Sequence, residues 1–266
     1  MRLIMLYHRA DAEKNTGFIE LFRRECGRYS LAFSVFMTED VTEEYLCSFP
    51  PDTLFINRSR EWKLAETLEQ HGFRVCNNST VARLGNDKAA AAAQFKEWGI
   101  PIMESYDSPP AHYPYVMKST DGHGGSEVFL IRNEDDLKEK QALLSGRRVL
   151  FQEFCDSPGR DLRLYIVQNR IVAAMLRESR DDFRSNYSLG GTARPVTPDK
   201  KERALAERIL SHISLDFAAI DLIMHRGVPV FNELEDAAGS RMLYRYSDVD
   251  IVALFMAQLF SSDPGR

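Results

Sequence analysis

The chain has 266 residues, 44% of them hydrophobic and 27% charged, which is enough to bury a sizeable core in one composite unit or in two to three small domains. Its 34 lysines and arginines face 39 aspartates and glutamates, and this net charge of -5, without a basic block, argues against a nucleic-acid partner. No apolar run reaches the length of a membrane span or of a signal peptide, so we expect a cytoplasmic protein without a membrane partner. In that compartment we expect four reduced cysteines: Cys26, Cys47, Cys76 and Cys155.

The first 80 residues alternate short apolar runs with helical patterns. We expect strands at 3–7, 31–36, 53–57 and 73–76, and helices at 17–28 and 60–71. This alternation predicts a small parallel α/β domain, and the turn and N-cap chemistry of residues 77–80 places its boundary near residue 80.

The next block, residues 81–148, begins with one of the strongest helix signals in the chain. The run NDKAAAAAQFKEW at 86–98 is rich in alanine, and Asn86 or Asp87 can cap its first turn. We then expect a strand at 115–118, a glycine-rich turn at 121–125, a strand at 126–131 and a helix at 134–144. These elements predict a second small α+β domain.

The remaining block, residues 149–266, reads as a third domain. Three strand signals follow one another, VLFQEF, DLRLYIVQ and RIVAAMLR, and their short connections predict that all three lie in one antiparallel sheet. A polar loop at 180–194 and a helix at 199–213 precede two strands, AAIDLIM and VPVFNELE, which flank a turn at 225–227, and an amphipathic helix at 248–260 closes the chain.

A lysine followed at once by a glycine-rich loop is the first chemical signal. Lys118 ends a strand, and the glycines of residues 122–125 would let backbone N–H groups approach phosphate oxygens while the lysine supplies charge. The pattern is neither a Walker loop nor a Rossmann fingerprint, and a protein kinase is excluded because its glycine loop precedes the lysine. A polyphosphate site is one interpretation, and an ordinary hairpin is the other.

Three carboxylates form the second signal. Glu233 and Glu235 lie two residues apart on one strand and therefore on one face, and Asp221 lies on the strand before it. If the hairpin register brings Asp221 beside them, the three oxygen donors suit Mg²⁺ bridging nucleotide phosphates. The alternative is a solvated strand face.

Two further clusters are weaker taken singly. Arg177 and the loop residues Arg184, Ser185 and Asn186 could cover a reacting phosphoryl group. The strand at 151–155 could offer backbone groups to an adenine edge, with Asp161 placed for ribose hydroxyls.

The order of these segments along the chain resembles an ATP-grasp domain, and specifically the RimK-type ligases, which attach amino acids such as glutamate to peptide or amino-acid acceptors. The resemblance covers residues 75–245, and the run DFRSN at 182–186 followed by two glycines at 190–191 is its most specific part. It implies an α/β (α+β) ATP-grasp fold behind a small N-terminal parallel domain, with domains at 1–80, 81–148 and 149–266.

The resemblance also implies a role for each matching residue. The implied nucleotide-binding residues are Lys88, Lys118, Ser119, Gly122, Gly124 and Gly125 for phosphates, Gln152, Glu153, Phe154 and Cys155 for adenine, and Asp161 and Arg163 for ribose or the metal-phosphate network. The implied catalytic residues are Arg177, Arg184 and Asn186 at the γ-phosphate and acyl phosphate, and Arg241 at a substrate carboxylate. The implied metal ligands are Asp221, Glu233 and Glu235, for two Mg²⁺ ions or Mn²⁺.

One position departs from the family pattern. Glu235 stands where the family usually has asparagine, and Gly239-Ser240-Arg241 follows instead of a Pro-Gly segment, which affects the substrate class. We expect ATP-dependent joining of a carboxylate, on a small molecule or peptide, to an amine through an acyl phosphate, by a protein that can self-associate. The alternatives are a noncatalytic ATP-binding regulator, a ligase that uses a hydroxyl or thiol acceptor, and an enzyme that modifies a ribosomal peptide.

Overall fold

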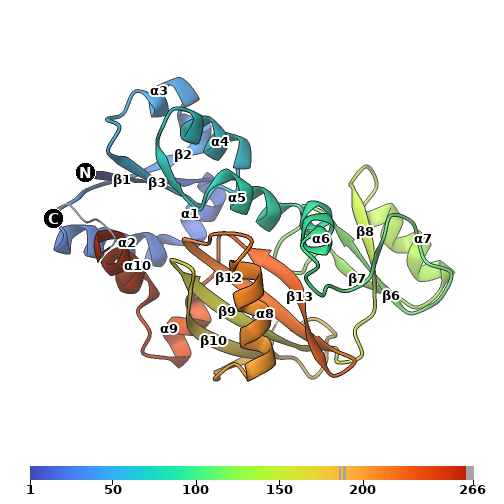
Figure 1. Ribbon diagram of the computed structural model, residues 1–266. Coiled ribbons are helices and arrows are strands. Elements are labelled where there is room, and N and C mark those ends of the chain that lie inside the picture. The colour runs from blue at the N-terminus through green and yellow to red at the C-terminus, as the bar shows by residue number, and fades with distance from the viewer. Residues whose placement is uncertain (186, 188–189, 262–266) are drawn as a thin grey trace.

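The computed structural model describes residues 1–185, 187 and 190–261, and arranges them around three sheets (Figure 1). The predicted mixed α/β class is confirmed: the first sheet is parallel, and the other two are antiparallel. Within the described residues, no helix is both long and apolar enough to cross a bilayer.

The N-terminal domain is the parallel sheet with its helices. Its strands, in the spatial order β2-β1-β3-β4, are β1 (Arg2–Tyr7), β2 (Ala32–Met37), β3 (Thr53–Asn57) and β4 (Arg74–Cys76). Its helices are α1 (Arg9–Lys14), α2 (Thr16–Arg28), the 3-10 turn η1 (Thr38–Asp40), α3 (Glu43–Cys47) and α4 (Trp62–Gln70). Strand β1 is almost wholly buried because helices cover both faces of the sheet, as parallel sheets require.

Two helices lead from this domain into the rest of the chain. They are α5 (Ser79–Asn86) and α6 (Lys88–Glu97). Asn78 caps α5 by accepting a hydrogen bond from Val81 N at 2.9 Å, and Asp87 caps α6 by accepting from Ala89 N and Ala90 N at 3.0 Å. The predicted alanine-rich helix is confirmed, whereas α5 was not foreseen beyond its cap.

The central sheet is covered by α7 (Glu134–Leu143) on one side. Its strands, in the order β5-β8-β6-β7, are β5 (Ser105–Tyr106), β6 (Tyr115–Ser119), β7 (Val128–Ile131) and β8 (Val149–Glu153). The expectation that residues 149–154 share a sheet with the next two strands was wrong, because β8 pairs with β6, with Val116 opposite Gln152. Phe151 is the physical reason: it packs in the core of this sheet with Tyr115 and Met117, so residues 154–159 cross between sheets instead of forming a hairpin turn.

The third sheet has the order β11-β10-β9-β12-β13. Its strands are β9 (Arg160–Val167), β10 (Arg170–Glu178), β11 (Thr192–Pro195), β12 (Phe217–His225) and β13 (Val228–Glu235), and the helices that follow or interrupt them are α8 (Lys200–Leu210), α9 (Arg241–Tyr246) and α10 (Ile251–Ser261). Helices α5, α6 and α8 cover one face. The other face packs against α2 and α10 through Phe22, Phe217 and Phe255, and this contact joins the N-terminal domain to the sheet.

Strict alternation along β9 and β12 decides where polar side chains go. Leu162, Leu164 and Ile220 face the helices α5, α6 and α8. Their neighbours in sequence therefore face the opposite side, and at the ends of the strands nearest the central sheet this side carries charged residues instead of core residues.

Candidate functional site

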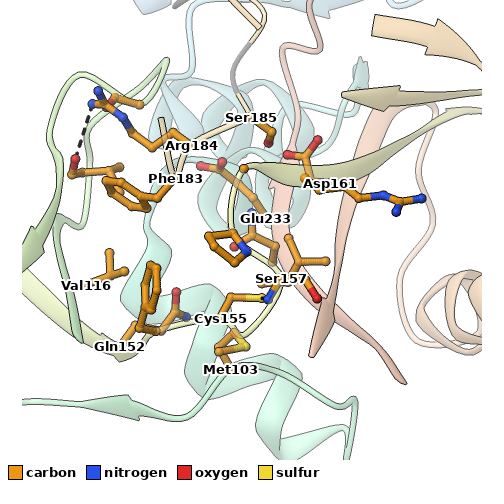
Figure 2. A pocket seen from close by; sticks show the side chains of 18 of the residues that line it. Met103, Val116, Gln152, Cys155, Ser157, Asp161, Phe183, Arg184, Ser185 and Glu233 are labelled. Atoms are coloured by element: carbon orange, nitrogen blue, oxygen red, sulfur yellow. Dashed lines mark hydrogen bonds between the residues drawn. The ribbon is translucent and has the colours of Figure 1, made fainter. Parts of the chain in front are cut away.

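A cleft that is open to solvent lies between the central sheet and the third sheet (Figure 2). Its charged lining residues are Lys88, Lys118, Glu153, Arg160, Asp161, Arg177, Arg184 and Glu233. Its apolar lining includes Met103, Val116, Val128, Phe183 and Ile223. One end of the cleft is thus largely apolar and the other charged, as in sites that bind a ligand with an apolar part and a charged part.

The apolar end is formed by the segment that leaves β8. Glu153, Phe154 and Cys155 line the cleft as this segment crosses between the sheets, and Gln152 precedes them on β8, as predicted. Met103 and Val116 face the same space in Figure 2, and neither was predicted. The signal for Val116 was available, since it lies two residues before Lys118 and so on the same strand face; an apolar residue such as Met103 cannot be told from core by its sequence.

Two lysines meet at the charged end. Lys118 Nζ donates to Gln152 Oε1 at 3.0 Å, and Lys88 Nζ lies 3.0 Å from Glu233 Oε1 and contacts Gly122 O. Lys118 is only 7% exposed, and this burial lowers its pKa to about 8, although the nearby Glu233 acts in the opposite direction. The cleft therefore holds two cations with little solvent around them, which is an environment that favours a polyphosphate.

The glycine-rich loop between β6 and β7 covers part of this end. A Cβ at Gly122 would lie 2.2 Å from Ser119 Oγ, so a larger residue there would displace the Ser119 hydroxyl, and Gly124 and Gly125 have φ of 68° and 78°. Of the predicted loop residues only Gly125 lines the cleft. Ser119 instead donates to Glu127, so its side chain holds the loop's shape.

Arg184 bridges two loops across the opening of the cleft. Its Nη1 donates to Gly125 O at 2.6 Å, while its Nε and Nη2 hold Asp182 at 3.0 and 2.6 Å. The hydrogen bonds from Arg184 hold the pKa of Asp182 below its usual range, against a smaller opposing effect of burial. Arg184 thus lines the cleft, as predicted, but is engaged with the glycine-rich loop; the predicted Asn186 lies outside the described residues.

The three predicted carboxylates converge. The β12–β13 register places Asp221 opposite Glu233, with Asn232 bulged out beside them, and oxygens of Asp221, Glu233 and Glu235 lie within 4.8 Å of one another. Asn232 also lines the cleft and was not predicted. The bulge that exposes it cannot be read from sequence, because nothing in the run VPVFNELE marks the extra residue.

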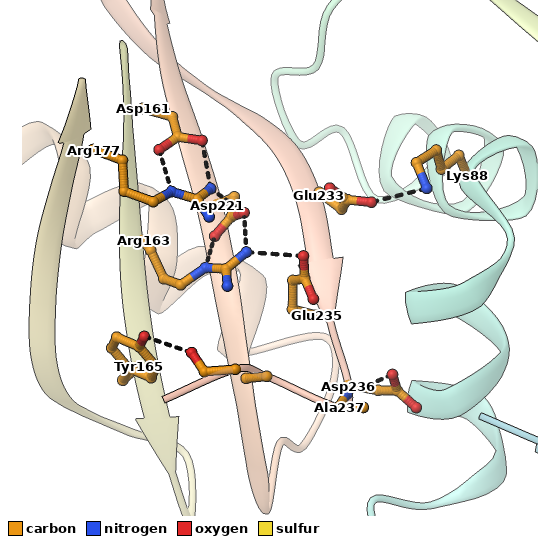
Figure 3. A network of polar contacts seen from close by, with 12 residues as sticks. Lys88, Asp161, Arg163, Tyr165, Arg177, Asp221, Glu233, Glu235, Asp236 and Ala237 are labelled. Atoms are coloured by element: carbon orange, nitrogen blue, oxygen red, sulfur yellow. Dashed lines mark hydrogen bonds and ion pairs between the residues drawn. The ribbon is translucent and has the colours of Figure 1, made fainter. Parts of the chain in front are cut away.

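Two buried arginines hold the acidic cluster in place (Figure 3). The register sets Arg177 opposite Asp161, and Arg163 opposite Asp221. Arg177 Nε donates to Asp161 at 2.6 Å and its Nη2 to Asp221 at 2.6 Å, while Arg163 binds Asp221 at 2.8 and 2.6 Å and Glu235 at 2.8 Å. Burial by itself would raise the pKa of Asp221, but the two guanidinium groups hold it below its usual range.

This network decides which carboxylates can receive a metal. The oxygens of Asp221 already accept three hydrogen bonds and the residue is 1% exposed, whereas the side chains of Glu233 and Glu235 are 27% and 30% exposed and are paired at one oxygen each. The donor set, all carboxylate oxygen, fits a hard divalent cation such as Mg²⁺. Glu233 and Glu235 therefore have oxygen lone pairs left for a metal, whereas Asp221 is buried behind them.

Not all predicted residues reach the cleft. Arg163 lies behind the carboxylates and is not among the described residues that line it. Arg177 lines the cleft, with its guanidinium committed to Asp161 and Asp221. Arg241 begins α9 and is exposed, away from the cleft lining.

The Glu235 position, where the chain departs from the family pattern, is charge-compensated. Its Oε1 pairs with Arg163 Nη2, so the additional negative charge already has a buried partner. The loop after it is anchored as well, since Tyr165 donates to Gly239 O at 2.8 Å and Arg58 to Ala238 O at 3.1 Å. This loop therefore links the end of β13 to β9 and to the N-terminal domain.

Comparisons with known proteins agree with this geometry. The family model of the RimK-like ATP-grasp domain matches residues 89–259. A probable alpha-L-glutamate ligase from Sodalis glossinidius is 29% identical over 203 residues, which cover 71% of this chain and 69% of that protein. Beta-citrylglutamate synthase B from Danio rerio is 27% identical over 205 residues, or 69% of this chain and 51% of that protein, so the chain spans about half its length. The crystal structure of a RimK domain ATP-grasp protein from Sphaerobacter thermophilus has the same fold, with a TM-score of 0.71 at 19% identity over 97% of this chain and 98% of that one.

Proposed function

The chain belongs to the RimK-like ATP-grasp family and is an ATP-dependent ligase, and from this premise we propose that it joins a carboxylate to an amine through an acyl phosphate. The observation that supports this reaction most strongly is how apolar and charged residues are distributed along the cleft. One end is an apolar slot, and the other end has two lysines beside a carboxylate cluster. That order matches adenine, polyphosphate and metal along one nucleotide.

The nucleotide would lie with its adenine between Met103 and Val116, along the backbone of residues 153–155. Its phosphates would reach Lys118 and Lys88, whose charges have little competition from water. Arg184, already bonded to Gly125 O, would keep the glycine-rich loop closed over them. Closure of this kind excludes water, which would otherwise hydrolyse an acyl phosphate.

Two Mg²⁺ ions would be held by Glu233 and Glu235, with Asp221 behind them. When bound, they would neutralise the charge that develops on the transferred phosphoryl group. The protein's own part is positioning, because Arg163 and Arg177 fix the carboxylates through buried, charge-assisted hydrogen bonds.

In the proposed reaction a substrate carboxylate oxygen attacks the γ-phosphorus, which releases ADP and leaves an acyl phosphate. The amine nitrogen then attacks the acyl carbon, phosphate departs, and the amine loses a proton. The two relatives are named as a probable alpha-L-glutamate ligase and a beta-citrylglutamate synthase, which supports an amino acid such as glutamate as one substrate. The exposed Arg241, after the altered loop, is our candidate for holding a substrate carboxylate.

Release of ADP and phosphate from Mg-ATP tests the proposal. We would measure it against a panel of carboxylic acids paired with amino acids and short peptides, with and without hydroxylamine. A carboxylate-dependent hydroxamate is expected from the wild type and the Lys138→Met control, whose lysine is 67% exposed on α7, and none from Lys118→Met.

The outcome separates the competing functions. A hydroxamate that forms while only hydroxyl or thiol acceptors give product would identify another acceptor class. Activity confined to long peptides would indicate modification of a ribosomal peptide. Tight Mg-ATP binding without a hydroxamate for any carboxylate would contradict the ligase mechanism and favour a regulator.

A further inference from the structure

We propose that Cys155, Asp156 and His225 form a second metal site, for a borderline-soft divalent cation such as Zn²⁺, at the outer rim of the cleft. The site is separate from the carboxylate cluster of Asp221, Glu233 and Glu235. It goes beyond the proposed ligase reaction and does not depend on it.

The three residues come from two elements that meet at this rim. Cys155 and Asp156 lie in the segment between β8 and β9, and His225 ends β12 at the turn into β13. One ligand atom from each, a sulfur, a carboxylate oxygen and an imidazole nitrogen, lies within 4.8 Å of the other two. Among the described residues, the only other group with such convergence is the acidic cluster of Asp221, Glu233 and Glu235. This donor set, with its thiol and imidazole, suits Zn²⁺ or Co²⁺ better than Mg²⁺.

His225 is oriented as a metal-binding histidine would be. Its side chain is 11% exposed, and Nε2 lies 3.4 Å from Glu153 Oε2 and makes no hydrogen bond of good geometry. On the other side of the ring, Nδ1 lies 3.5 Å from Asp156 Oδ1. Nδ1 accepts a long hydrogen bond from the Asp156 backbone N–H at 3.5 Å, so Nδ1 is the unprotonated nitrogen and the proton is on Nε2, on the side of Glu153. In the proposed site the ion would replace this long hydrogen bond at Nδ1. A carboxylate behind a ligating imidazole is the usual outer partner in zinc sites.

The charges around the site balance when a divalent ion is present. A Cys155 thiolate and the Asp156 carboxylate would together neutralise the ion's two charges. Glu153 does not add to this sum, because its Oε1 is paired with Arg226 Nη2 at 2.5 Å. The backbone N–H of Arg226 donates to Asp156 Oδ2 at 3.0 Å, which leaves Oδ1 to face the ion.

The spacing needs little adjustment. Tetrahedral zinc bonds of about 2.0–2.3 Å place ligand atoms about 3.5 Å apart, and the Asp156 and His225 atoms already have that separation. Cys155 Sγ now contacts Met224 O at 3.0 Å and would turn from this carbonyl to the ion, losing its proton to solvent. The side chain of Asp156 is 51% exposed, so the ion has a path from solvent and the fourth position can hold water.

Cobalt titration in excess Mg²⁺ tests the site, since Mg²⁺ competes with Co²⁺ for carboxylate oxygens and only Co²⁺ bound to a thiolate gives a near-ultraviolet charge-transfer band. We expect one equivalent of Co²⁺ to give this band in the wild type and in Cys47→Ser, which removes a half-buried free cysteine elsewhere. Cys155→Ser and His225→Gln should lose it, and Zn²⁺ should displace it. A wild type without the band, or a band unchanged in His225→Gln, would overturn the proposal.

A measurement on the unaltered protein guards against variants that fail to fold. Alkylation of each cysteine is followed by peptide mass spectrometry with and without Zn²⁺. At ten times the dissociation constant, alkylation of Cys155 should slow about tenfold, because only the metal-free fraction reacts. Cys47 serves as the internal reference and should be unaffected. Equal rates at Cys155 with and without Zn²⁺ would contradict the site.

Discussion

Replacing Lys118 with methionine should stabilise the protein at neutral pH while removing nucleotide binding. Lys118 is 7% exposed, and burial lowers its pKa to about 8 from an ordinary 10.5. Methionine has nearly the same length and carries no charge to desolvate. The lysine would thus be retained for function at a cost in stability.

The magnitude follows from the pKa. A fall from 10.5 to about 8 corresponds to about 3 kcal/mol of unfavourable free energy for burying the charged lysine at pH 7. The substitution also removes the 3.0 Å bond to Gln152 Oε1, and leaving that oxygen without its donor costs about 1–2 kcal/mol. We therefore expect a net gain of about 1–2 kcal/mol at pH 7.

The gain should depend on pH in one direction. The folded wild type releases the Lys118 proton near pH 8, whereas the unfolded chain keeps it to about pH 10.5. The unfolded state binds more protons in this window, so wild-type stability rises with pH and the advantage of the variant shrinks. Below pH 8 the lysine is charged in both the folded and the unfolded state, so the whole free-energy cost of burying its charge is present.

Urea unfolding at pH 7, 8 and 9.5 measures this difference, and equilibrium dialysis with Mg-ATP checks that nucleotide binding is lost. Lys138→Met, on the exposed face of α7, controls for the general effect of removing a surface lysine. A Lys118→Met variant that is less stable than the wild type at pH 7, or a stability difference that does not change with pH, would refute the reasoning.

Three further predictions concern the charged network. Arg163→Met should destabilise the fold by about 3–5 kcal/mol in urea unfolding, because the buried Asp221 would keep only Arg177, which also has to compensate Asp161. Arg160→Met, at an exposed position, should stay within about 0.5 kcal/mol, and similar losses from both would contradict the buried pair. Arg184→Ala should lower turnover about 10²–10³-fold in an ADP-release assay with ATP binding little changed, and near-normal turnover would remove Arg184 from the mechanism. Glu235→Asn should raise the Mg²⁺ concentration for half-maximal nucleotide binding by about tenfold or more, and an unchanged Mg²⁺ requirement would show that Glu235 is no ligand.

The sequence predicted most elements because their signals are local. The short apolar runs of β1, β3 and β12 and the alanine-rich α6 are recognised from neighbouring residues only. The assignment of β8 failed because sheet membership is a property of distant contacts: Phe151 packs with Tyr115 and Met117, 34 or more positions earlier. Short connections usually join neighbours in one sheet, and here one connection crosses between sheets instead.

The sequence predicted which residue types form the candidate site better than it predicted which contacts they make. The convergence of Asp221 with Glu233 and Glu235 required only the hairpin register, and the structure has it. That Arg163 and Arg177 would be bound to these carboxylates, and Arg184 to Gly125 O, depends on side-chain directions in a folded sheet. A sequence names a charged residue but does not say which of several opposite charges it meets.

The paired charges also bear on how metal and nucleotide bind together. Four carboxylates, Asp161, Asp221, Glu233 and Glu235, face four cations, Arg163, Arg177, Lys88 and Lys118, so the site is balanced before any ligand enters. Lys88 is held by Glu233, and a phosphate that attracts Lys88 would free a Glu233 oxygen for Mg²⁺. A metal on Glu233 would likewise release Lys88 to phosphate. Because such coupling must be reciprocal, we infer that Mg²⁺ and nucleotide each raise the affinity of the other, with the Lys88–Glu233 ion pair as the element that both displace.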